Sequence, residues 1–276
     1  MEHFEGHGDH WCAVGFKDAR VVIENAPKAI KEGIAARGYI YDFPENKGQL
    51  VPIMYPPKGA VQTCYMLLAT DTSNTIESFF PVLEGIKNRV VIGQKYPWED
   101  GIEGEIEVDW TNLPSLSFFA PYFRHNFDKI EPGAEVDVYL AGAAYVVEKA
   151  PMEYQIESGG MYEVALQDFL RDNPQKTKDD FPYMTIYMDD AVMLFPTGVY
   201  SDYEYRGKIL ELEYIKFLGE KIAKTKVCIE KDNHGYKTLI NLYIPENSVR
   251  GVKLEIGTDI MARIWLTGYT KEGGRI

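Results

Sequence analysis

The stretch that decides the expected fold is Leu116-Ser-Phe-Phe-Ala-Pro121, because a similar stretch, Ile240-Asn-Leu-Tyr-Ile-Pro245, follows 124 positions later. At the same interval each is followed by a segment with a central glycine, Lys129–Val136 in the first case and Lys253–Ile260 in the second. A repeated β unit of this kind predicts two related modules. The alternative is that any two antiparallel strands joined by a glycine turn look alike. The identical pairs are Pro121/Pro245, Lys129/Lys253, Glu131/Glu255 and Gly133/Gly257.

Short alternating strands, glycine-marked bends and a late closing strand favour a β-rich α+β fold with a few short helices. We expect two related small β-barrel modules of OB-like type, at residues 90–150 and 203–276. Residues 1–89 then form a mixed α/β region, and residues 151–202 a helix with a linker or insertion. A β-sandwich is the alternative, because it would produce much the same pattern of strands.

The remaining elements follow from local periodicity. Apolar residues at helical intervals and a capping-box spacing predict a helix over Ser73–Arg89, although Pro81 lies within it. Shorter helices are expected at Ala29–Arg37 and Tyr162–Arg171. Strands are expected at Arg20–Glu24 and Val61–Ala69.

The charge of the chain is unevenly distributed. The net charge is −13, yet residues 203–276 carry 13 basic and 10 acidic residues, so the excess acid lies in residues 1–202. Binding to nucleic acid usually needs a basic surface, because phosphate neutralisation supplies most of the affinity. We therefore expect a basic protein as partner and consider nucleic acid unlikely.

The three cysteines, Cys12, Cys64 and Cys228, are odd in number and widely spaced, which favours a reducing compartment. The N-terminus has no signal-peptide pattern, and no apolar run approaches the ~20 residues that span a bilayer. We expect a cytoplasmic protein that is not embedded in a membrane. The sequence leaves its oligomeric state open.

One group of residues has the chemistry of metal ligands. Three of the five histidines lie within the first ten residues, close to an aspartate, and imidazole and carboxylate both bind transition metals. A polar chain end that binds nothing is the alternative interpretation. The candidate ligands are His3, His7, Asp9 and His10.

Two further groups could bind a partner. Tyr203, Tyr205 and Arg206 open the basic last quarter, and aromatic rings beside a basic group can stack on nucleic-acid bases. The carboxylates of Glu103, Glu105, Glu107 and Asp109 alternate with apolar residues, so we expect them on one solvated strand face.

The sequence contains none of the motifs GxGxxG, GxxxxGK[ST], GxSxG or HExxH, and it assigns no cofactor. The leading hypothesis is therefore a binding or interaction protein without a catalytic site. The first alternative is a metal-dependent enzyme using the N-terminal His/Asp cluster. The second is single-stranded nucleic acid binding by the C-terminal module.

Overall fold

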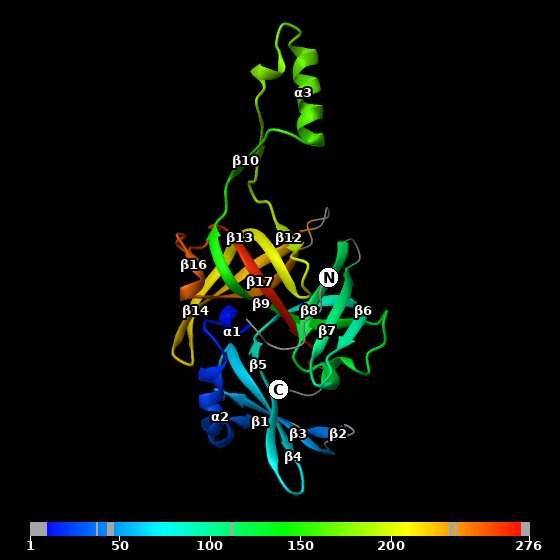
Figure 1. The fold of residues 1–276 in the computed structure, drawn as a ribbon, viewed down its shortest axis with the longest axis vertical. Coiled ribbons are helices and arrows are strands. Elements are labelled where there is room, and N and C mark those ends of the chain that lie inside the picture. Colours follow the sequence, from blue (N-terminus) through cyan, green and yellow to red (C-terminus); the bar gives the residue numbers. More distant parts are fainter. Residues whose placement is uncertain are drawn as a thin grey trace. The chain divides into compact units, whose positions relative to one another are not determined.

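The computed structural model divides the chain into two compact units (Figure 1). Unit 1 comprises residues 1–149 and 192–276, and unit 2 is the intervening segment 150–191. The residues that the structure describes are 10–36, 38–42, 47–110, 113–231, 235 and 237–271.

Helices are few and strands dominate. The helices are α1 His10–Ala13, α2 Arg20–Glu32 and α3 Gly160–Asp172, with short helical turns η1 Phe123–Phe127, η2 Lys178–Asp180 and η3 Glu246–Ser248. The strands of the first half are β1 Ile34–Ala35, β2 Tyr39–Asp42, β3 Lys47–Tyr55, β4 Val61–Ala69, β5 Asn74–Leu83, β6 Ile86–Pro97, β7 Gly104–Trp110, β8 Leu113–Ala120 and β9 Glu135–Lys149. Those that follow are β10 Glu153–Ile156, β11 Met184–Tyr187, β12 Met193–Pro196, β13 Asp202–Phe217, β14 Glu220–Lys231, β15 Lys237–Pro245, β16 Val249–Arg250 and β17 Asp259–Tyr269.

A small antiparallel sheet forms the N-terminal part of unit 1, with the order β1-β3-β4-β5 and β2 paired to β3. Helix α2 packs on β3 and β4, and the Tyr65 hydroxyl donates to the carbonyl of Val22 at 2.7 Å. The expected strand at Arg20–Glu24 is wrong, because Val22, Ala26 and Ala29 recur at helical intervals and are buried together.

The helix expected over Ser73–Arg89 is also wrong, since β5 and β6 occupy this region. The register of β4 and β5 shifts between the pairs Met66↔Ser78 and Leu67↔Ile76, which leaves Glu77 as an extra residue in β5. A bulge of this kind changes the spacing of apolar side chains from two to three. Ile76 and Phe79 therefore imitate one face of a helix while lying in a strand.

The large mixed sheet closes on itself in two circuits of hydrogen-bonded strands. One runs β13-β14-β15-β9-β17 and returns to β13; the other runs β6-β7-β8-β17-β9 and returns to β6. Strands β9 and β17 belong to both, so the sheet is ringed without being a regular barrel. The expectation of a β-rich fold is confirmed.

The two circuits meet where β9 passes between two partners. Residues 141–143 of β9 pair with β15 in parallel and with β17 in antiparallel orientation. A Cβ atom at Gly142 would lie 3.2–3.4 Å from side-chain carbons of Ile240, Leu242 and Leu266, which are buried in the core. The small residues Ala141-Gly-Ala-Ala144 thus allow the close approach of backbone and side chains at this junction.

The pairing scheme of the circuits is unchanged when β6, β7, β8 and β9 are exchanged for β13, β14, β15 and β17. Two glycines take the same conformation before the last strand of each set, with φ of 86° at Gly133 and 89° at Gly257. Their amides donate to the carbonyls of Ile92 and Ile209 at 2.7 and 2.8 Å. Positive φ favours glycine at both positions.

Unit 2 consists of α3 and a two-stranded ribbon of β10 and β11. The helix expected at Tyr162–Arg171 is confirmed. Its inner face carries Tyr162 and Phe169, whose rings stack on Phe181 at centroid distances of 5.8 and 4.9 Å. The Tyr162 hydroxyl donates to the carbonyl of Phe181 at 2.7 Å, which joins the helix to the returning chain.

Candidate functional site

The N-terminal metal candidates fall largely outside the described residues, where His3, His7 and Asp9 lie. His10 begins α1, and its ring stacks on Trp265 with centroids 4.2 Å apart and an interplanar angle of 12°. The described part of the chain contains no group of three or more His, Cys, Asp or Glu side chains able to hold a metal. His10 is thus placed against an aromatic core residue.

The three residues expected at a binding surface are buried in unit 1. Tyr203, Tyr205 and Arg206 are 3%, 2% and 3% exposed. The Tyr203 hydroxyl donates to the carbonyl of Ser117 at 3.1 Å and accepts from its amide at 2.7 Å. The Tyr205 hydroxyl donates to the carbonyl of Cys228 at 3.1 Å, and burial raises the pKa of Tyr205.

Arg206 belongs to a buried ion pair on two neighbouring strands of one circuit. Its Nη1 atom lies 3.6 Å from Oδ1 of Asp259, whose side chain is 9% exposed. Lys208, which is paired directly with Asp259 in the β13–β17 register, places its Nζ 3.9 Å from the other carboxylate oxygen. This position favours a role in holding the strands rather than in contacting a partner.

The expectation of a solvated acidic face at β7 is wrong in part. Glu103 and Glu105 are buried, so a solvated face is wrong for these two residues. Glu103 accepts a hydrogen bond from the hydroxyl of Ser78 on β5, and Glu105 accepts one from Ser201 at 3.3 Å. The side of β7 that alternation assigns to solvent is covered by residues from distant parts of the sequence. Buried carboxylates need such donors.

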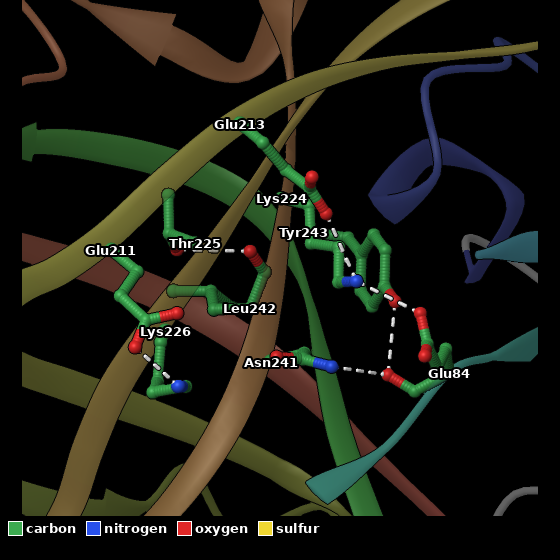
Figure 2. A network of polar contacts seen from close by, with 9 residues as sticks. All are labelled: Glu84, Glu211, Glu213, Lys224, Thr225, Lys226, Asn241, Leu242 and Tyr243. Atoms are coloured by element: carbon green, nitrogen blue, oxygen red, sulfur yellow. Dashed lines mark hydrogen bonds and ion pairs between the residues drawn. The ribbon is translucent and has the colours of Figure 1, made fainter.

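A polar junction joins the β5–β6 connection to strands β14 and β15. Figure 2 shows Lys224 between the carboxylates of Glu84 and Glu213, at 2.8 and 3.0 Å. The carbonyl of Glu84 also accepts from Asn241 Nδ2 at 2.7 Å and from the Tyr243 hydroxyl at 2.9 Å. These contacts hold the connection against the large sheet.

Burial alone would lower the pKa of Lys224, but its hydrogen bonds to Glu84 and Glu213 outweigh burial and raise the pKa above 10.5. We expect Lys224→Met to lower the free energy of unfolding by about 1–2 kcal/mol at neutral pH. Because the folded-state pKa is raised, this stabilisation is complete below pH 10.5 and is lost as the pH rises through the folded-state value.

Urea denaturation of both proteins at neutral and strongly alkaline pH measures this effect. Lys226→Met is the matched control, since Lys226 is on the same strand and pairs with Glu211. A difference between wild type and Lys224→Met that stays constant across the alkaline range would contradict the assignment.

A cavity of about 320 Å³ lies in unit 1 beside β12 and the ends of β8 and β14. Its walls are mainly apolar and include Leu116, Leu194 and Ile229. Two of its polar residues are engaged within the fold: Tyr203 bonds to Ser117, and the Glu230 carboxylate accepts from Thr238 at 3.1 Å. The described residues of the lining thus offer mainly apolar contact.

Unit 2 has the opposite character, with much apolar surface in contact with solvent. Of the thirteen large hydrophobic side chains exposed in the described residues, six lie in this unit of 42 residues. The most exposed are Tyr187 at 72%, Met161 at 64% and Val164 at 61%. The six are Met152, Tyr154, Met161, Val164, Tyr183 and Tyr187.

Sequence reasoning located α3 but did not single out its exposed apolar face. Met161 and Val164 are three residues apart and are exposed, whereas Tyr162 and Leu166 of the same helix are buried. The pattern that could have revealed them is the presence of apolar residues on both sides of one short helix.

In comparisons with family models, curated proteins and solved structures, no match to this chain was found. Within the ranges that the structure describes, no helix is both long enough and apolar enough to cross a membrane. We therefore infer function from the surfaces of the two units.

Proposed function

We propose that this chain is a non-catalytic interaction protein in which unit 2 is the binding element. The observation that carries the proposal is the group of six exposed large hydrophobic side chains in that unit. Contiguous exposed apolar surface on a soluble domain usually marks an interaction site. Unit 1 is then the scaffold that carries it.

The packing of unit 2 supports this role. In α3 only Tyr162 and Leu166 are buried, while Met161 and Val164 on the same helix are more than half exposed. A two-stranded ribbon with one helix buries too little surface for high stability by itself. Binding of a partner would cover the exposed side chains and add apolar burial.

We further propose that the scaffold consists of two related modules of OB-like type, one for each circuit. The unchanged pairing scheme on exchange of strands supports this, as do the matching turns at Gly133 and Gly257. Each circuit has five strands, the number found in OB-type barrels. The segments Leu116–Val136 and Ile240–Ile260 would then be the two copies of the internal repeat.

A cytoplasmic location is part of the proposal and is supported by the odd number and wide spacing of the three cysteines. The burial of Tyr203, Tyr205 and Arg206 gives no support to base stacking at those residues, which the nucleic-acid alternative requires. The metal-dependent alternative gains no support from the contacts of His10.

The proposal is tested by placing a photo-crosslinking amino acid at Val164 of the full chain, in cells that make the protein. The matched control position is Ile23 on α2 of unit 1, which is exposed to a similar extent. We expect one defined adduct from position 164 and none from position 23. The captured protein must then bind the unmodified chain in purified form, and the double variant Met161→Gln/Val164→Gln must weaken that binding. Equal adducts at both positions, or none at either, would overturn the proposal.

A further inference from the structure

We infer that the partner of unit 2 is a basic polypeptide whose Lys or Arg side chains flank an apolar strip. This inference rests on the proposed function and adds the chemical class of the partner. Residues 150–191 contain nine acidic and three basic residues, a net charge of −6 in 42 positions. The exposed hydrophobic side chains thus lie within a strongly negative surface, and a docked partner needs complementary charge.

The three basic side chains of unit 2 are all engaged within the unit. Arg171 pairs with Asp168 at 2.8 Å and with Asp172 at 3.3 Å. Lys176 pairs with Asp180 at 3.0 Å, and Lys178 lies over the ring of Tyr162 at 5.7 Å from its centroid. All three cations are thus engaged within the unit. Asp168, Asp172 and Asp180 take part in these ion pairs, and all nine carboxylates are on exposed residues.

One face of α3 brings the apolar and acidic groups together. Met161, Val164, Asp168 and Asp172 are at positions i, i+3, i+7 and i+11, so they lie along one side of the helix. This side differs from the face whose Tyr162 and Phe169 pack on Phe181. A partner that covers this side contacts two apolar side chains near the N-terminal end of α3 and two carboxylates near its C-terminal end.

The carboxylates are placed where they weaken the isolated helix. Asp168 and Asp172 lie in the last two turns of α3, and negative charge near a helix C-terminus is unfavourable to the helix dipole. Arg171 offsets this only in part. A basic group of a partner would relieve this unfavourable interaction. Binding of such a partner therefore accounts for two carboxylates at positions that do not favour the stability of α3 alone.

Charge also decides against other occupants. A second copy of the chain would bring two units of net charge −6 together, and like charges across an interface oppose association. Nucleic acid and anionic lipid surfaces are disfavoured for the same reason. A basic polypeptide is the class that satisfies the apolar and the acidic groups together.

The test measures binding of a Leu/Lys amphipathic helical peptide to the full chain by fluorescence anisotropy. A Leu/Glu peptide of the same pattern is the probe of opposite charge. We expect the Leu/Lys peptide to bind and its affinity to fall about tenfold for Met161→Gln/Val164→Gln and for Asp168→Asn/Asp172→Asn. Raising the salt from about 0.05 M to about 0.3 M should weaken binding as well. Ile23→Gln/Ile30→Gln on α2 is the matched apolar control and should leave the affinity unchanged.

Equal binding of both peptides, or an equal loss in the α2 control, would overturn the inference. The crosslinking experiment separates this failure from failure of the proposed function. If position 164 forms a specific, salt-insensitive adduct with an acidic protein, the proposed interaction function stands and the inference of a basic partner is wrong. Circular dichroism of each variant shows whether α3 is retained.

Discussion

Replacement of Asp259 by Ala is expected to lower the free energy of unfolding by about 3–5 kcal/mol. The guanidinium of Arg206 is 3% exposed and lies 3.6 Å from the Asp259 carboxylate. Removing the carboxylate takes an ion-pair partner away from a buried cation, so the desolvation cost of that charge is offset less. Urea denaturation followed by tryptophan fluorescence measures the loss.

The double variant Arg206→Met/Asp259→Leu distinguishes the ion pair from simple packing. It removes both charges and keeps apolar volume, so we expect it to recover most of the stability lost in Asp259→Ala. A double variant no more stable than the single one would contradict the argument. Asp18→Ala is the surface control, because Asp18 and Arg20 form an exposed ion pair that water screens, so its loss should change the stability little.

Replacement of Trp265 by Ala is expected to cost about 3–5 kcal/mol of unfolding free energy. Trp265 on the shared strand β17 is fully buried, with His10 stacked on its ring and the ring of Phe119 5.1 Å away. Truncation would leave a cavity at the point where α1 contacts the large sheet. The midpoint of urea unfolding, together with the m-value, reports the change.

The control for this variant is Tyr214→Ala, since Tyr214 is more than half exposed on β13. Its loss should stay within about 1 kcal/mol. Similar losses for the two variants would show that Trp265 does not hold α1 against the sheet. Trp265→Phe should retain part of the stability, because a phenyl ring preserves some of the contact with Phe119.

Local composition and spacing were sufficient for two elements. The strand expected at Val61–Ala69 has those bounds in the structure, and Tyr162–Arg171 lies within α3. The strand follows from a short run rich in β-branched, aromatic and other apolar residues, and the helix from the helical interval of its buried side chains.

Prediction was wrong where distant residues change the environment of a strand. The bulge at Glu77 gives β5 an apolar spacing that resembles that of a helix. Glu103 and Glu105, which alternation assigns to a solvated face, are buried and accept hydrogen bonds from Ser78 and Ser201. No window of local sequence contains these partners.

The candidate site shows the same division. Tyr203 and Arg206 are of residue types common at binding surfaces, yet both are buried on β13, which pairs with β17. Met161 and Val164 have the composition of a core, yet they remain exposed because unit 2 is too small to cover both sides of α3.

By itself the sequence determined that the chain is β-rich, strongly acidic over its first three quarters and provided with a helix at Tyr162–Arg171. These properties depend on composition and on side-chain spacing over a few residues. Only the tertiary structure decided that β9 and β17 are shared by two circuits, which of the acidic and aromatic residues are buried, and which face of α3 is exposed. The physical reason is that burial depends on contacts between residues 100 or more positions apart, such as Ala141 with Asn241.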